Sequence, residues 1–293
     1  MTVRRYLQLD VFADRPGAGN PLAVVLDAHG LDDAAMQAFA AWTNLSETIF
    51  LLPPDPGADY RVRIFTPRQE LPFAGHPSVG AAWAVLDRGL ATARDGELVQ
   101  QCAAGNLPVR VDGEGDGRVV GVRAPRACRR EPAAGTPGLL DAALAGLARG
   151  RCAPALWDNG PQWWLVELAD EAAVRAMAPD LAAITALTRH GEVGMAVFAF
   201  AERQGDRADY QLVVRAFCPA DGIPEDPVTG SANAAIGAAL AEAGRLPGHG
   251  GRYVASQGRE IGRDGRVEVH LDGDGEVWIG GRVQAVIRGS VDW

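Results

Sequence analysis

The sequence has no apolar run of about 18 residues, no dense cluster of Lys and Arg, and no Cys-x-x-Cys pair. The first absence predicts no transmembrane helix, and the segment after Arg4 and Arg5 lacks the apolar region of a secretion signal. The second, together with a net charge of -9, argues against nucleic acid as a partner. We therefore expect a soluble protein with neither a membrane nor a nucleic acid as its partner.

Cysteine and histidine are also sparse. Four cysteines in 293 residues are too few for a disulfide scaffold. The five histidines show neither H-x-x-x-H nor H-E-x-x-H spacing, so no metal site is predicted. Free thiols are typical of a reducing compartment, and we expect the protein in the cytoplasm.

Short runs of alternating apolar and polar residues, separated by Gly- and Pro-containing turns, are abundant. This pattern is typical of half-buried antiparallel strands. Helical periodicity is less frequent, and it predicts helices over 32–43, 77–88, 138–149, 170–177 and 231–243. The composition, 47% hydrophobic and 22% charged, allows a substantial core. We predict an α+β fold rather than alternating βαβ units.

The two halves of the chain share a loose internal repeat. In each half, a strand motif and a proline loop precede a Gly-initiated, Ala/Gly-rich helix. The first half reads Arg63-x-Phe65-x-Pro67 and then Gly75-His76, and the second reads Arg215-x-Phe217-x-Pro219 and then Gly230-Ser231. The repeat predicts two similar domains, each a mostly antiparallel sheet or barrel around one central helix. Chance similarity of two small-residue helices is the alternative.

A segment rich in Pro, Arg and Gly at 125–137 carries no apolar period. We place the boundary between the domains there. The expected first domain is 1–126 with a returning C-terminal strand at about 283–293, and the expected second domain is 127–282.

Both repeat motifs put a glycine at the start of a helix, where free N–H groups favour an anion. The second motif adds the hydroxyl groups of Thr229 and Ser231. Two such helix ends that face one cleft would hold a carboxylate from both sides. Ordinary capping, in which these hydroxyls only satisfy backbone N–H groups, is the competing interpretation.

Three titratable residues lie at promising places. Glu47 stands between a predicted helix and a strand, where partial burial would raise its pKa toward the range useful for proton transfer. His76 follows the first helix-initiating glycine, and the dipole there disfavours imidazolium. Asp226 precedes a proline near the second motif, and the residues alone leave a turn carboxylate and a substrate-binding carboxylate equally open.

The chain resembles the PhzF family of phenazine-biosynthesis isomerases, which share the diaminopimelate-epimerase fold. Motifs along nearly the whole length carry the resemblance. They are Gly19-Asn20-Pro21, Asn44-Leu45-Ser46-Glu47-Thr48, Phe73-Ala74-Gly75-His76-Pro77, Asp226-Pro227-Val228-Thr229-Gly230-Ser231-Ala232 and Ser256-Gln257-Gly258.

The resemblance implies a homodimer with neither a metal nor an organic cofactor, and an active site in the cleft between the two domains. It implies that Glu47 is the catalytic acid/base and that His76 and Asp226 assist. The groups expected to bind a small carboxylate-bearing substrate are Asn20, Ser46, Gly75, Thr229, Gly230 and Ser231. The predicted activity is therefore that of a cofactor-independent isomerase that moves a proton on a small metabolite.

Two alternatives remain. Related racemases use a cysteine at each central helix start, but here those positions hold His76 and Ser231. A racemase or epimerase of this fold would therefore use bases other than thiols, and a non-catalytic small-molecule-binding protein would retain only the cleft. The segment Asn159-Gly160-Pro161-Gln162-Trp163-Trp164 precedes a strand as Gly19-Asn20-Pro21 does, and we interpret its tryptophans as core residues.

Overall fold

The computed structural model describes residues 2–202 and 209–293. The chain divides into two compact units. The first consists of Met1–Arg123 and Gly280–Trp293, and the second of Ala124–Ile279. The predicted domains, 1–126 with about 283–293 and 127–282, have the same discontinuous arrangement. No helix in the described part of the chain has both the length and the apolar character needed to span a bilayer.

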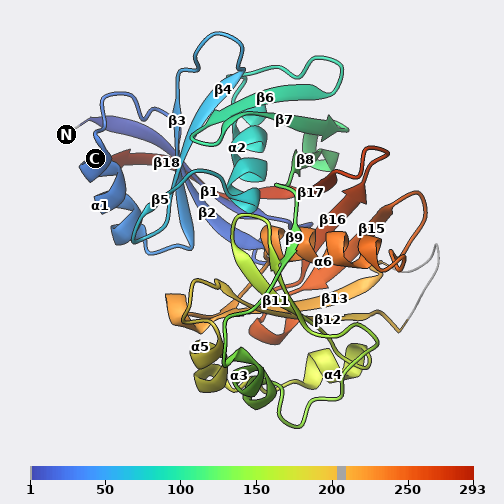
Figure 1. Ribbon diagram of the computed structural model, residues 1–293. Helices are drawn as coiled ribbons and strands as arrows, with labels where there is room; N and C mark the ends of the chain where they lie inside the picture. Colours follow the sequence, from blue (N-terminus) through green and yellow to red (C-terminus); the bar gives the residue numbers. More distant parts are fainter. Residues whose placement is uncertain (1, 203–208) are drawn as a thin grey trace. The chain divides into compact units, whose positions relative to one another are not determined.

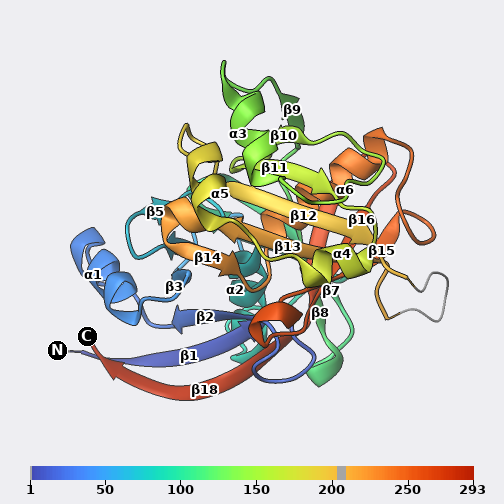
Figure 2. The ribbon, with the colours of Figure 1, turned by 90° about the horizontal axis from the view of Figure 1, so that it is seen from below.

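The first unit is a mixed, mostly antiparallel sheet (Figure 1). Its pairing order is β18-β1-β2-β3-β4-β6-β7-β8, in which β2–β3 and β4–β6 are the parallel pairs. The strands are β1 (Val3–Val11), β2 (Asn20–Val25), β3 (Glu47–Leu52), β4 (Tyr60–Phe65), β5 (Glu70–Leu71), β6 (Glu97–Cys102), β7 (Gly105–Asp112), β8 (Val119–Arg123) and β18 (Val283–Asp292). The two ends of the chain meet here, because β18 pairs with β1 along its length (Figure 2).

Helix α2 (Gly75–Asp87) is the central helix of the first unit. It contacts β1, β2, β3, β4, β6, β8 and β18, and its residues from Gly75 to Val85 are all buried. Helix α1 (Asp33–Thr43) packs with β3 and β4 at the periphery, and η1 (Gly115–Gly117) is a short 3₁₀ turn. A helix that strands surround on several sides must be apolar all round, which explains its Ala- and Gly-rich sequence.

The second unit has a closely similar sheet. Its pairing order is β9-β10-β11-β12-β13-β15-β16, in which β11–β12 and β13–β15 are the parallel pairs. The strands are β9 (Cys128–Arg130), β10 (Ala155–Asp158), β11 (Gln162–Glu167), β12 (Gly194–Phe200), β13 (Leu212–Cys218), β14 (Ile223–Asp226), β15 (Arg252–Gln257) and β16 (Gly265–Leu271). Strand β17 (Val277–Gly281) lies where the chain leaves this unit.

Helix α6 (Gly230–Glu242) is the central helix of the second unit and packs against β11 and β16. The peripheral helices are α3 (Thr136–Ala143), α4 (Glu171–Ala176) and α5 (Leu181–Leu187), with 3₁₀ turns η2 (Pro219–Asp221) and η3 (Arg259–Ile261). An apolar cluster beneath the sheet contains Trp164, Val174 and Leu187 from β11, α4 and α5.

The strand orders of the two units match element by element. Counting from β1 in the first unit and from β10 in the second, the first and second strands pair antiparallel, the second and third parallel, and the third and fourth antiparallel. A short strand antiparallel to the fourth, the central helix and a strand parallel to the fourth then follow. The predicted α+β fold with two similar domains around central helices is therefore confirmed.

One helix prediction had inaccurate bounds, and one helix was not predicted. The predicted helix at 138–149 begins earlier, at Thr136, and ends at Ala143. Helix α5 was not predicted, although its seven residues make it longer than α4, which was predicted at 170–177. The Asp180 side chain caps α5 by accepting from the N–H of Ala183, and two buried residues, Ile184 and Leu187, anchor it.

Candidate functional site

Glu47 lies at the first position of β3. Helix α1 ends at Thr43, and its C-cap is Asn44, whose φ of 52° is left-handed. This conformation allows the chain to reverse within two residues. Strand β3 then runs parallel to β2, with Glu47 opposite Leu22. The parallel pairing brings the first residue of β3 to the same end of the sheet as the start of β2.

Asn20 and Ser46, two of the predicted substrate-binding residues, meet at that sheet end. The Ser46 hydroxyl donates to Asn20 Oδ1 over 3.2 Å. Asn20 is buried and begins β2, whereas Ser46 is half-buried. The fold therefore brings together polar side chains from two motifs that are separate in the sequence, Gly19-Asn20-Pro21 and Ser46-Glu47-Thr48.

Glu47 and His76 form the closest contact between predicted catalytic side chains. Glu47 Oε2 lies 3.4 Å from His76 Nε2, and the two side chains are 17% and 7% exposed. Burial lowers the pKa of His76 to about 3. The Glu47 carboxylate acts in the opposite sense, since negative charge favours imidazolium, but burial is the larger effect. The pair is a carboxyl group beside a neutral imidazole at pH 7.

Helix α2 begins beside this pair without a side-chain cap among the described residues. Its N-cap is Ala74 in extended conformation, and Gly75 and His76 are its first two residues. Pro77 follows, and its missing N–H would have had no helical acceptor in the first turn. The backbone N–H groups of Gly75 and His76 are therefore in the first turn of the helix, where N–H groups have no intrahelical acceptor, as an anion site requires.

The start of α6 is arranged differently. Thr229 is the N-cap residue, but its side chain makes no capping hydrogen bond. Its hydroxyl instead donates to Asp226 Oδ2 over 2.5 Å. The capping interpretation is therefore wrong for Thr229, because its hydroxyl is bonded to a carboxylate. The N–H groups of Gly230 and Ser231 remain at the helix end, as they do in α2.

Gln257, at the end of β15, connects the residues at the start of α6. Its Nε2 donates to the Thr229 hydroxyl over 2.8 Å and to the Asp226 carbonyl over 3.0 Å. Its Oε1 accepts from the Thr229 N–H and from Asn233 Nδ2, both over 3.0 Å. This fully buried side chain was not predicted as a site residue. The Ser256-Gln257-Gly258 motif was the available signal, but nothing in it named the partners of Gln257.

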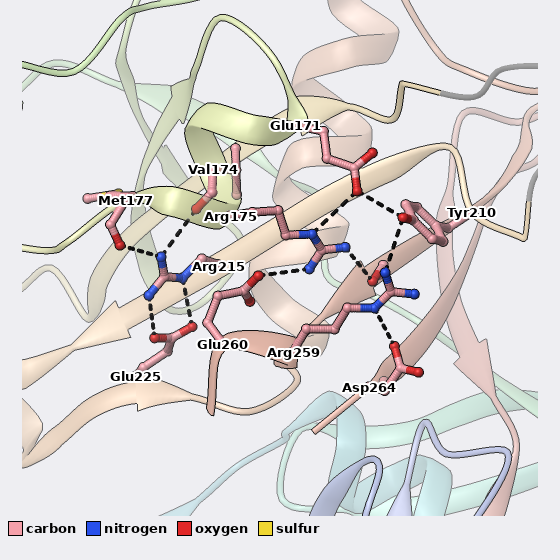
Figure 3. Close-up of polar contacts among 12 residues, drawn as sticks. Glu171, Val174, Arg175, Met177, Tyr210, Arg215, Glu225, Arg259, Glu260 and Asp264 are labelled. Atoms are coloured by element: carbon pink, nitrogen blue, oxygen red, sulfur yellow. Dashed lines mark hydrogen bonds and ion pairs between the residues drawn. The ribbon is translucent and has the colours of Figure 1, made fainter. Parts of the chain in front are cut away.

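A network of arginines supports both strands that carry these residues (Figure 3). Arg215 donates to both carboxylate oxygens of Glu225, the neighbour of Asp226, and to the carbonyls of Val174 and Met177. Arg175 bonds Ser256 and Glu260 on either side of Gln257. These contacts fix β14 and the loop after β15, and thereby the backbone positions of Asp226 and Gln257.

Ser231 is the second residue of α6 and is half-buried. Its hydroxyl accepts a hydrogen bond of 3.1 Å from Trp163 Nε1, and its carbonyl accepts one of 2.9 Å from Asn159 Nδ2. The loop Asn159-Gly160-Pro161, noted for its likeness to Gly19-Asn20-Pro21, therefore contacts a predicted substrate-binding residue.

Within each unit, the predicted site residues gather at the start of the central helix. We call Asn20, Ser46, Glu47, Gly75 and His76 the α2 site. We call Asp226, Thr229, Gly230 and Ser231 the α6 site. Cys218 is a buried residue at the end of β13. The described residues contain no group of three or more His, Cys, Asp or Glu side chains suited to a metal ion.

Comparison with known proteins identifies relatives across the whole chain. Residues 9–289 match the family model PhzC-PhzF, described as "Phenazine biosynthesis-like protein". A curated relative is the trans-2,3-dihydro-3-hydroxyanthranilate isomerase of Pseudomonas aeruginosa. It is 36% identical over 284 residues that cover 97% of this chain and 94% of the relative.

Two solved structures are also similar. A phenazine biosynthesis protein of the PhzF family from Bacillus anthracis has a TM-score of 0.84 and 26% identity, with all of both chains covered. A predicted epimerase from Pseudomonas aeruginosa has a TM-score of 0.76 and 35% identity, and the match covers 98% of this chain and 99% of that chain. These three relatives are named as an isomerase, a phenazine biosynthesis protein and a predicted epimerase.

Proposed function

The chain belongs to the PhzC-PhzF family of phenazine biosynthesis-like proteins and is an isomerase, and we propose that it moves a proton within a small, carboxylate-bearing metabolite with Glu47 as the acid/base. The observation that supports this most is the contact of 3.4 Å between Glu47 and the neutral His76 beside an uncapped helix start. A carboxyl group at such a place can exchange a proton while an adjacent anion is held by backbone N–H groups.

In this proposal, the substrate carboxylate binds to the backbone N–H groups at the helix starts and to the Ser231 hydroxyl. Glu47 removes a proton from one carbon, the electron pair shifts along the conjugated system, and Glu47 returns the proton to another carbon. His76 stays neutral and orients the Glu47 carboxyl, and Asp226 holds an amine or hydroxyl of the substrate. The resemblance to PhzF-type enzymes supports a cleft site between the domains and a reaction without a cofactor, and both are part of the proposal.

The substrate class follows from chemistry and from the name of one relative. The Pseudomonas aeruginosa relative is an isomerase of trans-2,3-dihydro-3-hydroxyanthranilate. That molecule carries a carboxylate, an amine, a hydroxyl and a conjugated ring. Its carboxylate suits the helix starts, and its amine suits Asp226. We propose a cyclic amino acid of this kind as the substrate class.

The test is an exchange experiment in deuterated water, followed by NMR, with trans-2,3-dihydro-3-hydroxyanthranilate as the probe. We expect the native protein to move the double bond and to incorporate solvent deuterium at the carbon that receives the proton. The Glu47→Gln variant keeps the shape of the side chain but cannot transfer a proton, so it should bind the probe without isomerising it. Glu97→Gln, which removes an exposed carboxylate from β6, is the matched control and should remain active. Full activity of Glu47→Gln would rule out the proposed acid/base.

A second candidate is epimerisation without thiols. It is favoured by the 35% identity to a predicted epimerase. Since His76 and Ser231, rather than cysteines, stand at the two helix starts, its bases would not be thiols. The same experiment separates the two reactions. Deuterium at a single stereocentre with no movement of a double bond would establish the epimerase, and binding with no exchange would contradict both reactions.

We also propose a homodimer that works in the cytoplasm. The dimer rests on the resemblance to the family, and the compartment rests on four cysteines that are all free thiols. Light scattering on the purified protein tests the dimer, and a molar mass equal to that of one chain, 30.8 kDa, would contradict it.

A further inference from the structure

Trp163 lies on β11 with 1% of its surface exposed, and its indole N–H reaches the start of α6. Nε1 donates to the Ser231 hydroxyl over 3.1 Å. Asn159, in the loop before β11, donates from Nδ2 to the Ser231 carbonyl over 2.9 Å. Two buried side chains of the second unit therefore hold both the backbone and the side chain of Ser231.

The direction of the hydrogen bond to Ser231 determines what that hydroxyl can still do. An indole N–H donates and never accepts, whereas a hydroxyl has one proton and two lone pairs. Trp163 therefore occupies a lone pair of Ser231 and leaves its proton available. The hydroxyl proton can then be donated to the same anion as the N–H groups at the start of α6.

The neighbouring tryptophan shows that this contact is not a general property of the core. Trp164 is as deeply buried as Trp163, at 2% exposed, and belongs to the apolar cluster on the opposite face of β11. Its Nε1 is buried and has no hydrogen-bond partner within residues 2–202 and 209–293. The fold thus tolerates an unpaired indole N–H here, and the pairing of Trp163 with Ser231 needs a separate explanation.

We propose that Trp163 is a positioning residue that fixes the Ser231 hydroxyl as a hydrogen-bond donor to the substrate carboxylate. Asn159 supports it by holding the Ser231 carbonyl. The inference rests on the proposed function, in which Ser231 binds that carboxylate. It adds a buried residue to the carboxylate-binding machinery and assigns a use to the loop and strand at 159–164.

The test compares Trp163→Phe with Trp164→Phe. Both variants lose one buried indole and leave similar space, but only the first removes a hydrogen bond to Ser231. With trans-2,3-dihydro-3-hydroxyanthranilate as the probe, we expect KM of Trp163→Phe to rise about three- to tenfold above that of Trp164→Phe, the range of one hydrogen bond. The value of kcat should stay the same. The carboxamide of the probe accepts a weaker hydrogen bond than the carboxylate, so its affinities for the two variants should differ less.

A double-mutant cycle links the effect to Ser231. In a Ser231→Ala background, Trp163→Phe should raise KM no further, because the positioned hydroxyl is already absent. Equal KM values for Trp163→Phe and Trp164→Phe, with Ser231→Ala still impaired, would overturn the inference and leave the proposed function intact. An unimpaired Ser231→Ala would instead refute the carboxylate-binding role of Ser231 and the inference with it.

A measurement on the Ser231→Ala variant covers the case in which Trp163→Phe does not fold or the probe is not turned over. In ¹⁵N–¹H spectra, loss of the acceptor should shift the Trp163 indole N–H signal and speed its exchange with solvent. The Trp164 indole signal should not change. A Trp163 signal that is the same in both proteins would show that the indole does not hold the Ser231 hydroxyl, and would overturn the inference.

Discussion

Helices α2 and α6 occupy equivalent places in the two units, and both begin without a side-chain cap among the described residues. Three peripheral helices differ from them. The side chains of Asp32, Asp170 and Asp180 each accept from a backbone N–H in the first turn of α1, α4 and α5. Capping stabilises a helix by about 1 kcal/mol, and the peripheral helix α3, whose N-cap is Gly135, also starts without a side-chain cap. We propose that the central helices lack a cap because their N–H groups serve a ligand.

The two helix starts differ in their surrounding side chains. The α2 site holds Glu47 beside His76, whose pKa burial lowers to about 3. The α6 site holds a chain of short hydrogen bonds from Gln257 through Thr229 to Asp226. A carboxyl group at a site that can hold a substrate can give and take a proton, whereas a binding group works best when its direction is already fixed. We infer that the α2 site performs the chemistry and that the α6 site orients the substrate.

Near-isosteric variants of the two sites should separate these roles and have the largest effects. Glu47→Gln should lower kcat by about 10²- to 10⁴-fold with little change in KM, because it removes proton transfer and keeps the shape. Thr229→Val removes the hydroxyl that bonds Asp226, and we expect it to raise KM by about tenfold with a much smaller change in kcat. Steady-state kinetics measures both. If Thr229→Val lowered kcat as much as Glu47→Gln does, the division between chemistry and orientation would be wrong.

Each unit also has a fully buried glutamine that bonds to its central helix. Variants of these two glutamines test whether the α6 site alone orients the substrate. In the first unit, Gln100 donates to Ser78 on α2 and accepts from Tyr60. Gln257 is its counterpart at α6. Replacement of either glutamine by Met leaves buried polar groups unpaired and should lower the free energy of unfolding by about 2–3 kcal/mol. Only Gln257→Met should also raise KM, because only Gln257 contacts the chain of hydrogen bonds to Asp226.

Urea unfolding and kinetics on the two glutamine variants provide the check. Equal losses of stability with a KM change in Gln257→Met alone would support the orienting role of the α6 site. A KM change of the same size in Gln100→Met would show that general loosening of a central helix accounts for the effect.

Acid should destabilise the fold through His76. Its pKa is about 3 in the folded protein and 6.5 for the unperturbed side chain. Between these values, the unfolded chain binds a proton that the folded chain does not. The free energy of unfolding therefore falls as the pH drops from 6.5 toward 3, by up to about 1.4 kcal/mol per pH unit, and this effect vanishes above 6.5.

The measurement for His76 is urea unfolding between pH 4 and 8 for the native protein and for His76→Gln. The stability of the native protein relative to this variant should rise with pH up to about 6.5 and then stay level. His29→Gln removes an exposed histidine and is the control. A difference between the native protein and His76→Gln that does not change with pH would mean that the folded protein accommodates the imidazolium.

The sequence predicted those elements that depend only on neighbouring residues in the chain. The repeated helix starts at Gly75 and Gly230 and the short alternating strands predicted the two similar units. Whether Glu47, His76 and Asp226 act as proposed remains a prediction, although the structure brings Glu47 next to His76. The connecting residues, Gln257 and Trp163, could not be predicted, because their partners depend on strand register that motifs do not encode. A motif identifies a polar residue but not the direction of its hydrogen bond.

The smallest expected difference concerns the glycines within the two central helices. A Cβ at Gly80 would lie 2.3 Å from Leu22 Cδ2 and 3.2 Å from Val11 Cγ2, whereas one at Gly237 would lie 3.1 Å from the Tyr253 hydroxyl and from Val269 Cγ1. Alanine gains about 1 kcal/mol over glycine in a helix, but overpacking costs about 1–3 kcal/mol. Gly80→Ala should therefore lower the free energy of unfolding by about 1 kcal/mol, and Gly237→Ala should change it by less than about 0.5 kcal/mol. Urea midpoints at equal m-values measure both, and the opposite order would mean that α6, rather than α2, is the more tightly enclosed helix.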